Sequence, residues 1–182
     1  PPAATNEKEA IKNDKWFLEK EKERLTSVNN EKETITLADR WFVSGLAYAY
    51  ARDHITGYQT FQKHYEDIHE ALENHDLYLP SLIYMRVPGT EIVLRQSQIQ
   101  RSFTEDDVPG NLMHAQTRES FISQQEEFYD RFLSAYKEHV LMLDGREELE
   151  MNTKQAIEWF SKPASNHIAY ALPDISVLLN NT

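Results

Sequence analysis

The sequence predicts a mostly α-helical protein, a bundle of about three to five helices in which two are long, with an insertion between them. Large apolar and aromatic residues recur at steps of three, four or seven over 36–75 and again over 112–143, as on the buried face of a helix. Between these stretches, residues 81–103 are rich in β-forming residues and contain a Pro-Gly pair, which predicts a β-hairpin or an extended arm.

The chain begins with a segment rich in proline and alanine, and we expect residues 1–6 to form a flexible tail. A single helical domain is expected to follow over 7–182, since no composition shift or repeat marks a boundary. From Glu7 to about Val28, Glu and Lys dominate and both Gly and Pro are absent, which favours a helix. Its apolar side is narrow and repeats every seven residues, at Ile11, Leu18 and Leu25.

The first long helix is expected to begin near Thr36, a residue type that caps helix N-termini, and to extend to His75. Gly57 is its weak point, because glycine inside a helix costs about 1 kcal/mol relative to alanine. A kink or a full break there is the alternative. The apolar stripe keeps its phase across Gly57, so we predict one continuous helix about 60 Å long.

The insertion is expected to start at Pro80, which cannot continue the preceding helix. Residues 81–87 would form one strand, Pro88-Gly89 the turn, and residues 91–103 the returning strand. Since an isolated hairpin is only marginally stable in water, this one should lie on the helices or pair with a partner.

The second long helix is predicted to end at Asp144-Gly145, where the glycine suits the residue after a helix. A shorter helix over 146–160 should follow, and Pro173 suits the first turn of a short last helix. The apolar stripe of the shorter helix comprises Leu149, Thr153, Ala156, Ile157 and Phe160.

Composition excludes several classes of function. A net charge of −11, with no basic run free of acids, argues against binding to nucleic acid or to anionic lipid. Without cysteine the chain has no disulfide, thiolate ligand or cysteine nucleophile. The sequence has no run of about 18 apolar residues, so we expect a soluble, acidic protein without membrane insertion. The start at Pro1-Pro2-Ala3 slightly favours an exported or periplasmic protein over a cytoplasmic one.

The signals for chemistry are weak. Glu66 and His69 have the Glu-x-x-His spacing of dimetal helical bundles, but the second copy that such sites need is absent. These two residues are weak candidates, and we expect neither a metal nor a cofactor. Four histidines, at 54, 64, 69 and 75, could titrate together as a switch, although we prefer to see them as residues at the edge of a helix face. Phosphate-binding glycine motifs and a Gly-x-Ser-x-Gly elbow are absent, so a non-enzymatic role is favoured.

The aromatic residues suggest where a partner would bind. Phe42 and Tyr50 fall off the apolar stripe of the first long helix, and the insertion adds three further interface candidates, Tyr84, Ile92 and Leu94. We expect an interaction or assembly protein that docks on a protein partner, or on its own copy, through helix faces or the hairpin edge. The alternatives are a small-molecule sensor with an aromatic pocket and a helical enzyme with dispersed acid and base residues.

Overall fold

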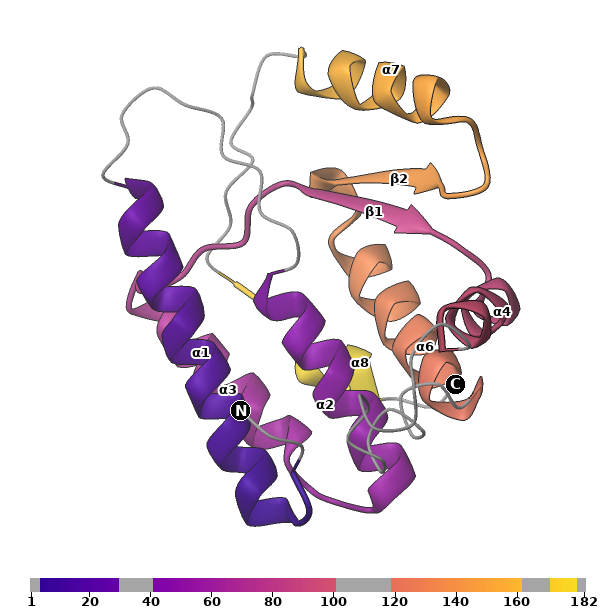
Figure 1. The fold of residues 1–182 in the computed structure, drawn as a ribbon. Helices are drawn as coiled ribbons and strands as arrows, with labels where there is room; N and C mark the ends of the chain where they lie inside the picture. Colours follow the sequence, from indigo (N-terminus) through magenta and orange to yellow (C-terminus); the bar gives the residue numbers. More distant parts are fainter. Residues whose placement is uncertain (1–3, 30–40, 101–118, 162–170, 180–182) are drawn as a thin grey trace. The chain divides into compact units, whose positions relative to one another are not determined.

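A computed structural model describes residues 4–29, 41–100, 119–161 and 171–179. The predicted class is confirmed: the protein is mostly α-helical, with a small two-stranded sheet (Figure 1). The chain divides into two compact units. The first contains Pro1–Tyr78 together with Tyr170–Thr182, and the second contains Leu79–Ala169. No observation tests the prediction of one domain after a six-residue tail.

The first unit is helical. It contains α1 (Glu7–Asn29), α2 (Phe42–Thr56), α3 (Phe61–Glu73) and the short α8 (Ile175–Leu179). The Asn6 side chain begins α1 by accepting a hydrogen bond from Glu9 N at 3.0 Å, as an N-cap residue does. The core side chains come from all four helices and include Leu18, Leu46, Ile68, Leu72 and Leu178.

The prediction of one continuous helix over 36–75 is wrong. Residues 36–40 lie outside the described residues, and the remainder forms two helices, α2 and α3, that separate at Gly57. Gly57 has φ 74, and its N–H donates to Asp53 O at 2.8 Å. A left-handed residue ends a helix, and glycine adopts that conformation without a steric penalty. Stripe members on both helices, such as Ala51 and Ile68, are buried, so the periodicity reflects burial and not the continuity of one helix.

The second unit combines both kinds of secondary structure. In chain order it contains β1 (Leu82–Arg86), α4 (Gly89–Gln100), α6 (Glu119–Ala135), the 3₁₀ turn η2 (Lys137–His139), β2 (Val140–Asp144) and α7 (Leu149–Phe160).

The inserted strand is present, but the predicted hairpin over 81–103 is wrong. β1 pairs with β2 in parallel, in register from Leu82 opposite Val140 to Arg86 opposite Asp144. Parallel strands require a crossover rather than a tight turn, and α4 and α6 both lie within this connection. Pro88-Gly89 begins a helix: Pro88 O accepts hydrogen bonds from Glu91 N and Ile92 N, at 2.9 and 3.1 Å.

The second long helix is also shorter than predicted. Residues 112–118 lie outside the described residues, α6 ends at Ala135, and the segment 140–144 becomes β2. Gly145 therefore does not cap a helix. Its N–H donates to Arg86 O at 2.8 Å, and a Cβ atom added there would lie 3.1 Å from Met85 Cγ. Glycine at this position allows the chain to pass close to β1.

The two faces of the sheet contact different helices. The Tyr84 ring lies 4.9 Å from the Tyr129 ring, and Arg86 pairs with Asp130 at 3.1 Å, so α6 covers one face. On the other side, Asn152 Nδ2 of α7 donates to Asp144 O at 2.8 Å. The sheet therefore lies between α6 and α7 (Figure 1).

Candidate functional site

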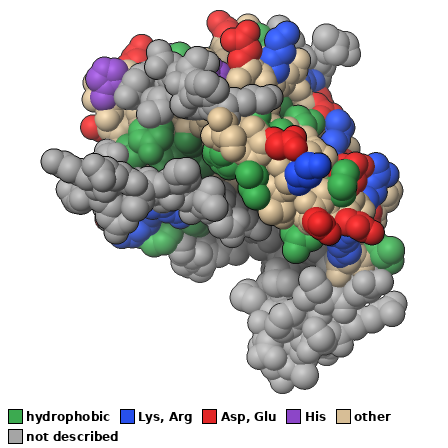
Figure 2. All heavy atoms as spheres, turned by 90° about the horizontal axis from the view of Figure 1, so that it is seen from above, with side chains coloured by type: hydrophobic (Ala, Val, Ile, Leu, Met, Phe, Trp, Pro, Cys, Tyr) green, Lys and Arg blue, Asp and Glu red, His purple; other side chains and the backbone are tan. Residues whose placement is uncertain are grey.

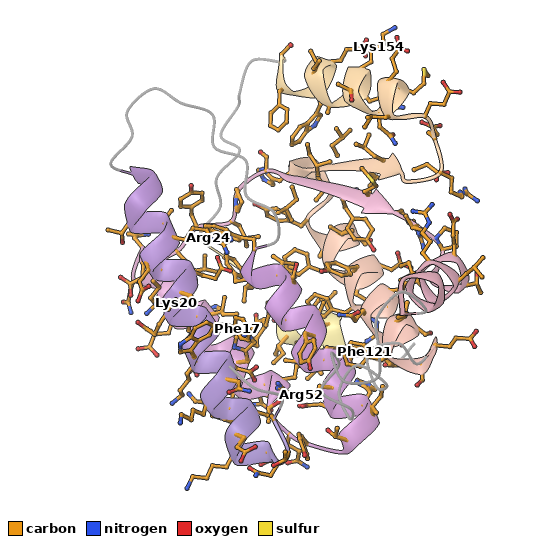
Figure 3. All side chains as sticks on the ribbon, viewed as in Figure 1. Phe17, Lys20, Arg24, Arg52, Phe121 and Lys154 are labelled. Atoms are coloured by element: carbon orange, nitrogen blue, oxygen red, sulfur yellow. The ribbon has the colours of Figure 1, made fainter. Side chains whose placement is uncertain are left out.

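Helix α7 packs on the sheet through a small, partly polar face. The residues on this face are Asn152, Gln155, Ala156 and Trp159, at the spacing of one helix side, and all of them are buried or partly buried. Asn152 holds the end of β2 through its side-chain amide. Lys154 points away from the sheet (Figure 3). The contact between α7 and β2 thus uses Ala156 and Trp159 but not Leu149 or Ile157, which are exposed.

Three apolar side chains of α7 lie on an exposed flank of the helix. We name Leu149, Thr153, Ile157 and Phe160 the α7 stripe. Successive members are four, four and three residues apart, so they share one side of the helix. Leu149 is 80% exposed, Ile157 62% and Phe160 41%. The sequence predicts this stripe together with Ala156 as a packing face. Among the described residues Ala156 is partly buried, Phe160 is about half covered, and Leu149 and Ile157 are mostly exposed.

Apolar exposure continues on the sheet. Because Tyr84 faces α6 and strand side chains alternate, Ile83 and Met85 face the side on which α7 lies. Both are exposed. Figure 2 views the molecule from above Figure 1, where α7 lies, and shows hydrophobic side chains at the surface beside acidic and basic ones. Apolar side chains exposed on both α7 and β1 are a feature that interaction surfaces share.

The charges around the α7 stripe are predominantly acidic. In the described segment 146–160, the exposed charged side chains are Arg146, Glu147, Glu148, Glu150, Lys154 and Glu158. Arg146 is bound to Asp144 at 2.6 Å, which holds the pKa of that carboxyl at about 2. The rim of the stripe therefore carries net negative charge at neutral pH.

Two of the five interface candidates proposed from sequence belong to the core of the first unit. Phe42 is 3% exposed and Tyr50 is 1% exposed, and the Tyr50 ring meets the Phe61 ring edge-on at 5.4 Å. Side chains buried to this extent offer no surface to a partner. They fall off the predicted stripe, but α2 is buried on most of its surface, so residues outside the stripe are covered as well.

The other three candidates lie in the second unit. Tyr84 is partly buried, and this burial, with the nearby Tyr129, raises its pKa to about 12. Ile92 is partly buried on α4, and Leu94 on the same helix is exposed. These three do not form a hairpin edge, because α4 replaces the expected second strand.

The weak metal candidates do not converge with further ligands. Glu66 accepts a hydrogen bond from Gln62 Nε2 at 3.0 Å, and His69 Nδ1 lies 3.6 Å from Glu73 Oε2. Within the described ranges, no three His, Asp or Glu side chains are grouped as a metal site requires. The expected absence of a metal or cofactor stays a prediction.

A buried polar cluster in the first unit was not foreseen. Arg52 of α2 donates to both carboxylate oxygens of Asp14 on α1, at 3.0 and 2.7 Å, and also to Thr60 Oγ1. Asp53 accepts hydrogen bonds from Thr60 N and Phe61 N at 2.6 and 2.7 Å, which caps α3. The spacing of Asp14 could have indicated its burial, because it is four residues from both Ala10 and Leu18, which lie on the buried side of α1. The cluster holds three helices together, and each of its charges is paired within it.

Across the described ranges, the helices are too short or too polar to cross a bilayer. Comparisons with protein-family models, with curated proteins and with solved structures found no match. The function must therefore be inferred from the residues of this chain.

Proposed function

We propose that this protein is a non-enzymatic interaction protein that docks on an amphipathic helix of a protein partner through the α7 stripe. The observation that carries the proposal is the orientation of α7. The helix turns the side with Asn152 and Trp159 toward the sheet. It leaves Leu149 and Ile157 mostly exposed and Phe160 41% exposed.

The free energy available at this surface is substantial. Full burial of a Leu, Ile or Phe side chain contributes about 1.5–3 kcal/mol. Apolar residues spaced by four and three positions lie on one side of a helix. This is the spacing through which an amphipathic helix packs against a protein partner. Because the rim is acidic, a partner helix whose apolar side is flanked by Lys or Arg would be favoured, and its association would slow as salt is added.

Site-specific photo-crosslinking tests the proposal directly. A photoreactive benzoylphenylalanine at Ile157, in the source cells, should form an adduct with one defined protein. The matched control is the same group at Met151, which is also apolar and exposed on α7 but lies off the stripe. An adduct with the chain itself would identify a homo-oligomer, which sedimentation velocity would then confirm.

The adduct formed from position 157 should disappear when Leu149→Glu is introduced into the same protein. It should persist when Met151→Glu is introduced instead. Both substitutions replace exposed residues, so each should change the free energy of unfolding by less than about 0.5 kcal/mol. Equal crosslinking at 151 and 157, or none at either, would contradict docking through the stripe. The sensor and enzyme alternatives remain predictions without a structural observation in their favour.

A further inference from the structure

His64 on α3 is buried against the backbone of α2. Its side chain belongs to a residue only 4% exposed, and its Nδ1 atom makes no hydrogen bond to any described residue. Its Nε2 atom lies 3.2 Å from where a Cβ atom on Gly45 would be, so the imidazole approaches α2 at a position that lacks a side chain. A buried ring nitrogen without a partner is tolerated when it is an unprotonated acceptor, and it is costly as a charged donor.

The charged groups around His64 come from each long helix of the first unit. They are Asp14 on α1, Arg52 on α2 and Asp67 on α3 itself. The short α8 carries no ionisable side chain. Asp14 is bound by Arg52 through two hydrogen bonds, so it cannot turn to His64 without leaving the longer contact with Asp53, at 3.7 Å, as the buried guanidinium's remaining ion pair among the described residues. Lys63 holds Asp67 at 2.6 Å. Both carboxylates are therefore already engaged.

We propose that the first unit is an acid-sensitive element, in which protonation of His64 loosens the packing of α3 against α1 and α2. The imidazolium form needs an acceptor at Nδ1, which the packed geometry of the described residues does not supply. Asp14 and Asp67 act on His64 only through space, because each is already bound by a cation. Movement of α3 away from Gly45 would admit water to both ring nitrogens. The proposal concerns the first unit and is independent of docking through α7.

The sign of the effect follows from linkage. Burial lowers the pKa of His64 below its ordinary 6.5, Arg52 lowers it further, and Asp14 and Asp67 oppose the shift. The unfolded chain therefore binds a proton that the folded chain does not. Stability is fully present above about pH 6.5 and is lost as the pH falls below that value, by up to about tenfold in the folding equilibrium constant per pH unit.

Hydrogen exchange of the α3 amides, measured on the full chain between about pH 7.5 and 4.5, tests the proposal. After correction for intrinsic exchange rates, the protection factors of the α3 amides in the wild type should fall by up to about tenfold per pH unit below pH 6.5. His64→Gln should remove most of this dependence, and His69→Gln, which alters a more exposed histidine on the same helix, should not.

An NMR titration of the wild-type histidines provides a second measurement that does not depend on whether His64→Gln folds. The Cε1–H signal of His64 should stay in the neutral position below pH 6.5, until the signals of α3 broaden or shift. Titration of His64 at or above 6.5 without change in α3 would overturn the proposal, as would equal pH dependence in the wild type and His64→Gln.

Discussion

The pair formed by Arg52 and Asp14 shows how a charge can occupy the core of a small helical unit. The two side chains are 8% and 10% exposed, so both have lost most of their hydration. Two parallel hydrogen bonds and the contact with Thr60 replace the lost water. Such a pair adds little stability compared with an apolar replacement, but removing one member leaves the other buried and unpaired.

Arg52→Ala should therefore lower the free energy of unfolding by about 3–5 kcal/mol, measured by urea denaturation. Arg86→Ala is the control, because it removes an exposed ion pair with Asp130 and should cost at most about 1 kcal/mol. The double variant with Asp14→Leu and Arg52→Met should recover most of the loss, since it removes both members of the buried pair and Asp53 keeps its hydrogen bonds from Thr60 and Phe61. An equal cost for Arg52→Ala and Arg86→Ala would contradict the burial of the pair.

At the scale of elements, the break between α2 and α3 is built from two local features. Gly57 ends α2 in a left-handed conformation, and the Asp53 carboxylate caps α3 through the amides of Thr60 and Phe61. The cap of one helix thus comes from the end of the helix before it. This arrangement holds the short connection in place.

Gly57→Ala distinguishes two helices from one. A Cβ atom added at Gly57 would meet nothing within 4 Å, so the effect comes from the backbone alone. With φ 74, alanine should lower the free energy of unfolding by about 1–2 kcal/mol. In a continuous helix the same substitution would raise it by about 1 kcal/mol.

Gly57→Asn provides the matched control for this measurement. Asparagine tolerates the left-handed region better than alanine does, so it should cost less. Urea denaturation of the three proteins gives the order directly. A stabilised Gly57→Ala variant would show that α2 and α3 are one helix.

At the scale of the whole molecule, the first unit is assembled from two distant parts of the chain. Leu172 and Leu178 are buried in it, and the Tyr65 hydroxyl donates to Pro173 O at 2.8 Å. The last described helix, α8, has five residues, too few to be stable as an isolated helix. Its position depends on these contacts with the helices of the first unit.

Leu178→Ala should consequently cost about 2–5 kcal/mol in the stability of the first unit, because it opens a cavity in that core. Leu179→Ala removes the neighbouring side chain, which is exposed, and should be nearly neutral. The measurement is hydrogen exchange of α1 and α3 amides, which reports the first unit without the second. Equal effects of the two substitutions would contradict the placement of α8 in this core.

The sequence by itself determined the features that depend on neighbouring residues. Helical periodicity established the mostly α class, and the apolar stripe from Leu149 to Phe160 was recognisable before the structure was known. Both signals arise within a few turns of chain. The end of the inserted strand before Pro88-Gly89 is likewise a local signal, but the turn predicted at these residues is the start of α4.

Only the tertiary structure decided the features that depend on distant contacts. The pairing of Leu82–Arg86 with Val140–Asp144, the ion pair of Asp14 with Arg52 and the burial of Phe42 all join segments far apart in the sequence. Periodicity shows that a helix has an apolar side, but it cannot show whether the rest of the chain covers that side. For α7 the described chain leaves that side exposed, because Asn152 and its neighbours already bind the sheet.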